Sequence, residues 1–178
     1  MPRLLPLSLL LIAGMANAAC PPLLDHRFKL LDGSSLDLCQ YADQPILVVN
    51  TASKCGFAPQ FDALEKLYRD YKPRGLLVIG FPSNDFRQEL PSNKEIGDFC
   101  RLTYFVQFPM VESSVVTGSK AIPFFKQLKA ATGDVPRWNF HKYVIAPGGK
   151  TVTAFGTLTK PDAPEILDAI RPGLRPAP

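Results

Sequence analysis

The segment ILVVNTASKCGF, residues 46–57, decides the fold of this chain. Its first five residues, Ile46–Asn50, form a nearly continuous apolar run, which is typical of a strand buried on both faces of a sheet. Apolar side chains then recur at helical spacing from Phe57 to Tyr71, with charged side chains on the other side, so an amphipathic helix is expected there. Cys55 lies between the two predicted elements, at a strand-to-helix turn.

The elements around this unit complete an α/β domain. A second buried strand is expected at Leu76–Phe81, and the order strand, helix, strand implies a parallel βαβ unit with a right-handed crossover. The remaining predicted elements are, in chain order, a hairpin of Phe28–Leu31 with Ser35–Leu38, helices over Asn93–Tyr104 and Ile122–Ala131, a hairpin of Tyr143–Ala146 with Thr151–Phe155, and a closing helix over Ala163–Ile170. This order predicts a thioredoxin-like fold, with a central mixed sheet flanked by helices and an extra N-terminal β-hairpin.

The first eighteen residues have the pattern of a secretory signal peptide. Arg3 is followed by an apolar run over Leu4–Met15 and by Ala16-Asn17-Ala18, which fits an A-x-A cleavage site. The run is too short for a transmembrane helix, which needs about 20 apolar residues. An uncleaved N-terminal anchor is the alternative. We therefore expect export to a bacterial periplasm, with residues 19–178 as a single domain.

Composition and charge exclude several classes of function. The 178 residues carry 20 basic and 16 acidic side chains, and the resulting net charge of +4 does not indicate a nucleic-acid partner. Two histidines and four cysteines stand apart along the chain, and no pair of cysteines has the C-x-x-C spacing. The sequence therefore predicts no metal site, and no cofactor is expected.

Cys55 is the candidate nucleophile. The N-terminus of the following helix offers free N–H groups and partial positive charge, and both favour a thiolate over a thiol. Ala58 stands where a dithiol oxidoreductase of the thioredoxin type has its second cysteine. A lone thiolate is suited to attack on the O–O bond of a peroxide, which leaves a sulfenic acid. The alternative for Cys55 is a small buried core residue.

Three motifs resemble those of the glutathione peroxidase family, of the cysteine-containing bacterial kind. Asn50–Phe57 is similar to the motif of the peroxidatic cysteine, Gly80–Phe86 followed by Gln88-Glu89 is similar to the second motif, and Trp138–Phe140 is similar to the third. The similarity extends from Leu24 to Ile170. It implies a thioredoxin fold and the reduction of hydrogen peroxide and of organic or lipid hydroperoxides.

The resemblance also implies roles for single residues. Cys55 is the peroxidatic nucleophile, and the Trp138 indole N–H and the Asn139 amide N–H donate near its sulfur, where they stabilise the thiolate and the leaving group. A core tryptophan and a turn asparagine are the plainer alternatives. Asp85 departs from the family pattern, which has glutamine there, and an ionised carboxylate beside Cys55 opposes its thiolate. Asp85 is therefore a residue that points elsewhere, a structural cap, or a protonated donor in the site, while Gln88 is another source of an amide.

Cys100 falls in the predicted Asn93–Tyr104 helix. By the resemblance it is a resolving cysteine, which forms a disulfide with oxidised Cys55 before a thioredoxin-like protein or glutathione reduces the enzyme. A buried core cysteine is the alternative. The spacing between Leu128 and Trp138 is shorter than in tetrameric members of the family, so the resemblance implies a monomer.

Cys20 and Cys39 bracket the N-terminal hairpin. In an oxidising compartment we expect them to form a structural disulfide that closes a loop of about 20 residues. Attachment of a lipid to Cys20 is disfavoured, because Asn17 stands where lipoprotein signals have an aliphatic residue.

Two rival functions remain open on this fold. The first is an exported thiol–disulfide exchange protein, against which Ala58 argues. The second is a redox sensor without enzymatic turnover.

Overall fold

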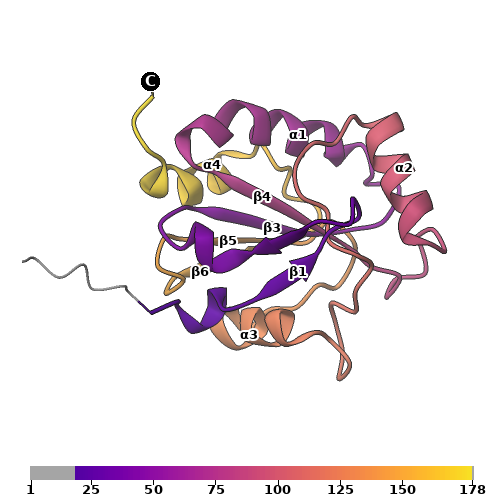
Figure 1. The fold of residues 1–178 in the computed structure, drawn as a ribbon, viewed down its shortest axis with the longest axis horizontal. Coiled ribbons are helices and arrows are strands. Elements are labelled where there is room, and N and C mark those ends of the chain that lie inside the picture. Colours follow the sequence, from indigo (N-terminus) through magenta and orange to yellow (C-terminus); the bar gives the residue numbers. More distant parts are fainter. Residues whose placement is uncertain (1–18, 178) are drawn as a thin grey trace, which may run out of the picture.

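The computed structural model describes residues 19–177, and the predicted signal peptide lies outside this range. A four-stranded sheet in the order β4-β3-β5-β6 forms the centre of the molecule (Figure 1). Its strands are β3 (Ile46–Thr51), β4 (Leu77–Pro82), β5 (Lys142–Ile145) and β6 (Val152–Phe155). β3 is parallel to β4 and antiparallel to β5, and β6 is antiparallel to β5. The predicted mixed sheet is confirmed.

Helices cover both faces of this sheet. They are α1 (Gln60–Tyr71), α2 (Asn93–Thr103), α3 (Pro123–Thr132) and α4 (Pro164–Ile170). In Figure 1, α1 and α4 lie above the sheet, α3 lies below it and α2 lies at one side. The predicted N-terminal hairpin is also confirmed, as β1 (Arg27–Lys29) pairs with β2 (Ser35–Asp37) in antiparallel register.

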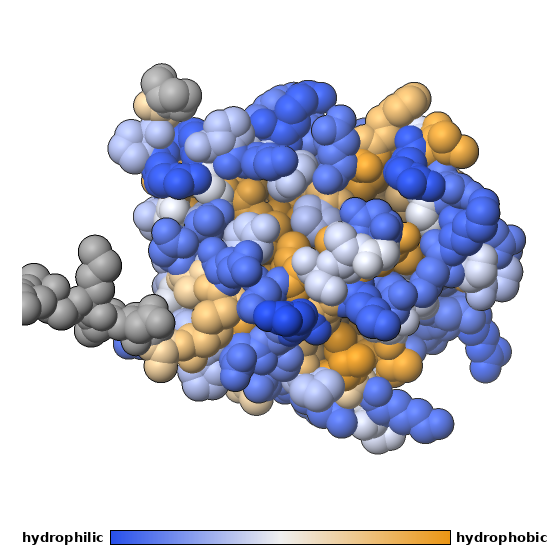
Figure 2. All heavy atoms as spheres, viewed as in Figure 1, coloured by the Kyte–Doolittle hydropathy of each residue, from blue (hydrophilic) through white to orange (hydrophobic). Residues whose placement is uncertain are grey.

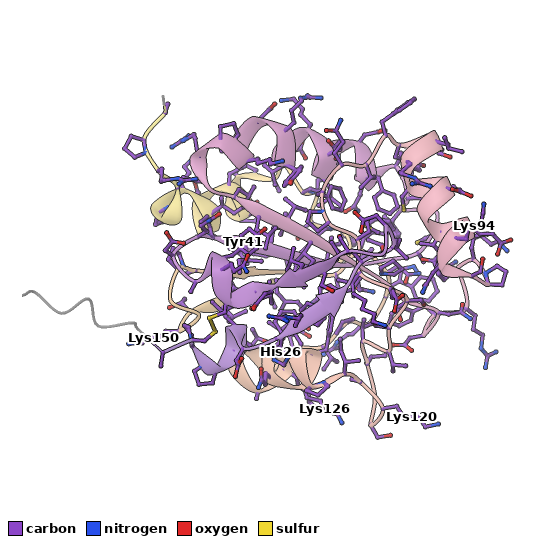
Figure 3. The ribbon with its side chains drawn as sticks, viewed as in Figure 1. His26, Tyr41, Lys94, Lys120, Lys126 and Lys150 are labelled. Atoms are coloured by element: carbon purple, nitrogen blue, oxygen red, sulfur yellow. A yellow bond between two sulfur atoms is a disulfide. The ribbon has the colours of Figure 1, made fainter. Side chains whose placement is uncertain are left out.

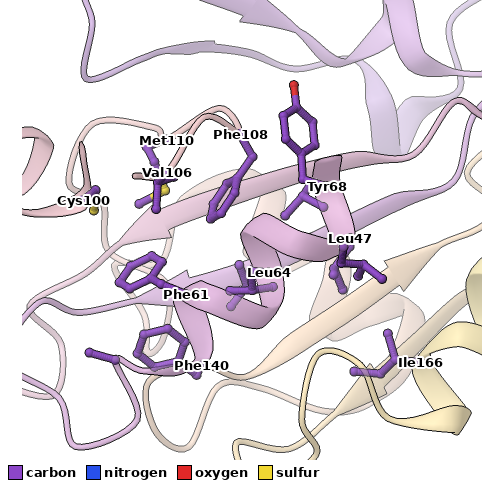
Figure 4. Packing of buried hydrophobic residues seen from close by; sticks show 14 of the residues in the cluster. Leu47, Phe61, Leu64, Tyr68, Cys100, Val106, Phe108, Met110, Phe140 and Ile166 are labelled. Atoms are coloured by element: carbon purple, nitrogen blue, oxygen red, sulfur yellow. The ribbon is translucent and has the colours of Figure 1, made fainter. Parts of the chain in front are cut away.

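The continuous apolar run of β3 is explained by two hydrophobic clusters, one on each face. Leu47 and Val49 pack in the cluster under α1 and α4, part of which is shown in Figure 4. Ile46 and Val48 pack in the other cluster, against α3 and the N-terminal hairpin. Successive side chains of a strand point to opposite faces, so a strand covered on both sides needs apolar residues at every position.

The main difference from the predicted elements concerns the start of α1. The helix begins at Gln60, not at Phe57. Between Cys55 and Gln60 the chain makes successive tight turns, in which Ala58 N–H donates to the Cys55 carbonyl at 2.9 Å. Pro59 directly precedes the helix, where its missing N–H removes no helical hydrogen bond. Cys55 therefore lies on a turn before the helix, and not on the first helical turn.

The start of α2 agrees with its predicted cap. The Ser92 side chain accepts from the Glu95 N–H at 3.3 Å, while the Glu95 carboxylate reaches back to the Ser92 hydroxyl at 2.6 Å. This pair of hydrogen bonds fixes the position at which α2, the helix that contains Cys100, begins.

The predicted disulfide between Cys20 and Cys39 is present, with a Cα–Cα distance of 5.6 Å (the yellow bond in Figure 3). It attaches the start of the described chain to the short helical turn Leu38–Tyr41. Within residues 19–177, no helix is long and apolar enough to cross a membrane.

Candidate active site around Cys55

Cys55 lies just beyond the carboxyl end of β3, on the turn that leads to α1. Its side chain is buried in the α1-side cluster, and the Phe57 N–H points at its Sγ at 3.5 Å. A backbone N–H directed at sulfur stabilises negative charge there, as a helix N-terminus does. The turn therefore supplies a donor to the thiolate, although the helix itself starts five residues later.

The Cys55 turn is held by the segment that follows β4. Ser53 N–H donates to Glu89 Oε1 at 3.0 Å, and Lys54 N–H donates to the Gln88 carbonyl at 2.8 Å. The first and second sequence motifs are thus joined by hydrogen bonds immediately before the reactive cysteine.

The third motif is held by Asn50, the last residue but one of β3. The Asn50 amide donates to the Trp138 carbonyl at 3.2 Å, and its Oδ1 accepts from His141 N–H at 3.0 Å. Phe140, which has a left-handed backbone with φ +61°, donates its N–H to the Asn50 carbonyl at 2.6 Å. Asn50 therefore brings the Trp138–Phe140 segment beside the Cys55 turn. The sequence analysis placed Asn50 in the first motif but gave it no role.

Neither of the two expected donors bonds to the Cys55 sulfur in this structure. Asn139 is fully buried, and its Nδ2 donates to Gln88 Oε1 at 2.9 Å. The Trp138 ring is 40% exposed and packs on Phe86, with ring centroids 5.4 Å apart. No hydrogen bond joins either side chain to Cys55 within the described chain. An amide oxygen is a better hydrogen-bond acceptor than a neutral thiol, which explains why Asn139 donates to Gln88 and not to Cys55.

Asp85 has a structural contact. Its Oδ2 accepts from the backbone N–H groups of Val116 and Thr117, at 2.7 and 3.0 Å. Of the three possibilities left by the sequence, this arrangement favours a structural cap and not a protonated donor to the peroxide. An ionised carboxylate is well suited to two converging N–H groups.

Cys100 is a free cysteine on α2, buried in the same hydrophobic cluster as Cys55. Figure 4 shows it beside Val106 and Met110. Burial, and then the nearby Glu89 carboxylate, raise the pKa of the Cys100 thiol to about 12. Cys100 is therefore unreactive while α2 stays in this position, because only a thiolate is a strong nucleophile.

The sequence analysis gave no role to two buried charged residues near the site, although it quoted the first of them within the second motif. Glu89 is this first residue. The other is Lys142, whose Nζ donates to the carbonyls of Thr157 and Thr159 at 3.3 and 2.5 Å. Burial lowers the pKa of Lys142 to about 7. A lysine directly before the apolar run Tyr143–Ile145 was the available signal, but the strand was expected to begin after it.

The described part of the chain contains no group of three or more His, Cys, Asp or Glu side chains arranged to hold a metal ion. A thioredoxin-like sheet that carries one cysteine at this turn, with alanine three positions later, defines a cysteine-dependent oxidoreductase.

Comparisons with known proteins show to which family of cysteine-dependent oxidoreductases the chain is similar. Residues 23–129 match the family model described as glutathione peroxidase. A glutathione peroxidase of Lactococcus lactis is 41% identical over 140 residues, covering 76% of this chain and 89% of the relative. The hydroperoxy fatty acid reductase of Synechocystis is 41% identical over 143 residues, covering 74% of this chain and 85% of the relative. The crystal structure of T. cruzi GPX1 has a TM-score of 0.63 at 27% identity, covering 84% of this chain and 94% of that structure's chain. The chain belongs to the glutathione peroxidase family and is a thiol-dependent peroxidase.

Proposed function

We propose that Cys55 reduces hydrogen peroxide and organic or lipid hydroperoxides. The Cys55 thiolate attacks the terminal oxygen of the hydroperoxide, and the O–O bond breaks. The remaining oxygen takes up a proton and leaves as water or an alcohol, while Cys55 becomes a sulfenic acid. The observation that carries this proposal is that segments from all three motifs meet at a turn with one buried cysteine.

The surface near the site supports apolar hydroperoxides as substrates. Phe86 and Trp138 form a partly exposed aromatic pair, and Leu158 is largely exposed on the loop whose Thr157 hydroxyl donates to the Asn139 carbonyl at 2.8 Å. Such side chains shield an alkyl or acyl group from water when it binds. The similarity to a hydroperoxy fatty acid reductase supports the same class of substrate.

We propose further that Cys100 resolves the sulfenic acid. Its thiol displaces the hydroxyl from Cys55, which gives a Cys55–Cys100 disulfide and water. Cys100 is buried in the reduced fold, so α2 has to unwind locally before the two sulfurs can meet. Gly97 lies within α2 and lowers the cost of unwinding by about 1 kcal/mol relative to alanine.

The disulfide is then reduced by a thioredoxin-like protein or by glutathione. Leu102 and Phe105, at the end of α2 and just beyond it, are 75% and 73% exposed. Apolar atoms also reach the surface over this helix in Figure 2. An exposed apolar area beside Cys100 favours a protein reductant. We propose that the chain acts as a monomer after export to the periplasm, where the Cys20–Cys39 disulfide persists.

Steady-state peroxide consumption tests the proposal, with thioredoxin or glutathione as the sole electron donor. We expect turnover with cumene hydroperoxide and hydrogen peroxide, and faster turnover with thioredoxin. Insulin reduction without peroxide consumption would instead identify a thiol–disulfide exchange protein. Oxidation of Cys55 without repeated turnover with either donor would identify a sensor.

A further inference from the structure

Glu89 is a buried glutamate to which the proposed reaction assigns no role. Its side chain is 7% exposed. Its Oε1 accepts from Ser53 N–H at 3.0 Å and from Leu90 N–H at 2.7 Å, while its own N–H donates to Asn84 Oδ1 at 3.2 Å. Burial raises the pKa of this carboxyl above its usual range. Burying a carboxyl group lowers the stability of the fold unless hydrogen bonds compensate for the lost water. The hydrogen bonds of Glu89 fix the geometry of one segment in particular.

That segment is the turn carrying Cys55. Ser53 is two residues before Cys55, and its N–H is held by a side chain that reaches across from the segment after β4. The neighbouring residue Gln88 holds the Lys54 N–H through its carbonyl and the Asn139 amide through its side chain. Of these contacts, the Glu89 contact is the one in which a side-chain oxygen accepts from the backbone of the Cys55 turn, so a substitution can remove it.

The same segment also adjoins the hydrophobic cluster that contains the second cysteine. The Glu89 charge contributes, after burial, to the raised pKa of Cys100. Leu90, the next residue, packs on the cluster that contains both cysteines. Glu89 therefore belongs to a segment that is hydrogen-bonded to the Cys55 turn and packs on the cluster that contains Cys100.

We propose that Glu89 is a positioning residue for Cys55, which acts by holding the Ser53 N–H so that the Cys55 sulfur stays buried and aligned for a small peroxide. This inference rests on the proposed role of Cys55. If the contact is lost, the turn loosens. The sulfur is then less well aligned for peroxide, but more open to a larger reagent.

The chain contains a matched control. Glu65, on α1, is also a buried glutamate, at 8% exposed, and its Oε2 accepts from the Gln107 N–H at 2.8 Å. Replacing Glu65 by leucine removes the same kind of contact from a segment that does not hold the Cys55 turn. A general loss of stability should affect the Glu65→Leu and Glu89→Leu variants alike.

The experiment measures two rates at Cys55 by peptide mass spectrometry, at a temperature where each variant is folded. The first is oxidation by hydrogen peroxide in a single turnover, and the second is alkylation by iodoacetamide. We expect Glu89→Leu to slow oxidation at least tenfold and to accelerate alkylation at least threefold. Glu89→Gln, which keeps an oxygen acceptor for Ser53, should stay within threefold of the unaltered protein on both rates, and Glu65→Leu should stay within twofold.

Glu89→Asp keeps the charge but withdraws the carboxylate from Ser53, and it should behave like Glu89→Leu. This variant serves the same test if Glu89→Leu does not fold. The proposal is overturned if Glu89→Leu and Glu65→Leu give the same two rates, or if Glu89→Gln is as impaired as Glu89→Leu. Alkylation needs no peroxidase activity, so it tests Glu89 even if the unaltered protein consumes no peroxide.

Discussion

The two ends of β3 hold the chain together in different ways. In the segment that leads into the strand, Cys39 is bonded to Cys20, and the Ala42 carbonyl accepts from the Gly148 N–H at 2.7 Å. In the segment that leaves the strand, Cys55 stays free, and Cys100 in the same hydrophobic cluster is free as well. One end is thus closed covalently, whereas the other keeps two thiols apart.

The distribution of unsatisfied polar groups follows the same division. Within the described residues, the buried side-chain atoms without a hydrogen-bond partner are Thr51 Oγ1, Ser53 Oγ, Gln60 Oε1, Asn139 Oδ1 and His141 Nε2. All of them lie at the Cys55 end of β3, at the start of α1, or in the segment that Asn50 holds beside that end. Buried polar groups without partners destabilise a fold and tend to gather at functional sites. The comparison indicates that the disulfide end supplies stability that the reactive end lacks.

The largest expected effect distinguishes the two ends by activity. Cys55→Ser should reduce peroxide turnover at least a thousandfold, because a serine hydroxyl does not form the nucleophilic anion at neutral pH. Steady-state peroxide consumption measures this. Cys39→Ser is the matched change at the other end and should keep activity within twofold while the protein is folded. Substantial turnover by Cys55→Ser would contradict the assignment of the nucleophile.

The next effect concerns the second free thiol. Cys100→Ser should lower thioredoxin-supported turnover at least a hundredfold, but leave the first oxidation of Cys55 intact, because only the step that forms the internal disulfide is lost. Rapid mixing with one equivalent of peroxide, followed by mass spectrometry, separates the two steps. Normal turnover of this variant with thioredoxin would make Cys100 a core residue only.

At the disulfide end the effect should be one of stability. Cys39→Ser removes a cross-link between residues 19 positions apart, and we expect the free energy of unfolding to fall by about 3 kcal/mol. Urea unfolding under oxidising conditions measures this. The reduced, unaltered protein is the control and should lose a similar amount. Equal stability of the oxidised and reduced protein would mean that the cross-link does not stabilise this end.

The last prediction tests the cost of burying charge near the site, through a change in stability that is small at any one pH near neutrality. Because the pKa of Lys142 is lowered to about 7, while an unfolded lysine titrates near 10.4, the unfolded chain binds an extra proton between these values. The stability of the folded protein therefore rises with pH in this range, by up to about 1.4 kcal/mol per pH unit. Lys142→Met should remove this rise, so that its stability relative to the unaltered protein is greatest near pH 7 and declines toward pH 9.

Denaturant unfolding at several pH values measures that difference. Lys126, which is exposed on α3 and labelled in Figure 3, provides the control, and Lys126→Met should leave the pH dependence unchanged. If Lys142→Met and the unaltered protein have parallel pH dependences, the lysine is not neutralised by its burial.

The elements of the fold were predictable because apolar periodicity is a local property. β3, β4 and α2 lie within one or two residues of their expected positions. The start of α1 was not predicted correctly, because the apolar pattern continues through Phe57 while Pro59 delays the helix. The Cys20–Cys39 pair was predictable from its place around the hairpin.

The roles of polar side chains in the site were less predictable, because their partners are distant in sequence. Asp85 accepts from backbone groups 31 and 32 residues away, and Glu89 accepts from one 36 residues away. Backbone N–H groups are present at nearly every position, so the sequence carries no mark of which ones a carboxylate will hold. The motifs indicated which segments would meet, but not which atoms.

The aromatic pair of Trp138 and Phe86 has a consequence for optical measurements. Trp138 is the single tryptophan of the chain, and its half-open ring lies on the segment that Asn50 and Gln88 hold beside Cys55. Light absorbed at the red edge of protein absorption excites tryptophan almost alone, so this emission comes from one indole, on a segment hydrogen-bonded to residues around the Cys55 turn. The molecule carries its own fluorophore, and we expect its emission to change when Cys55 is oxidised, so that the redox cycle can be followed without a label.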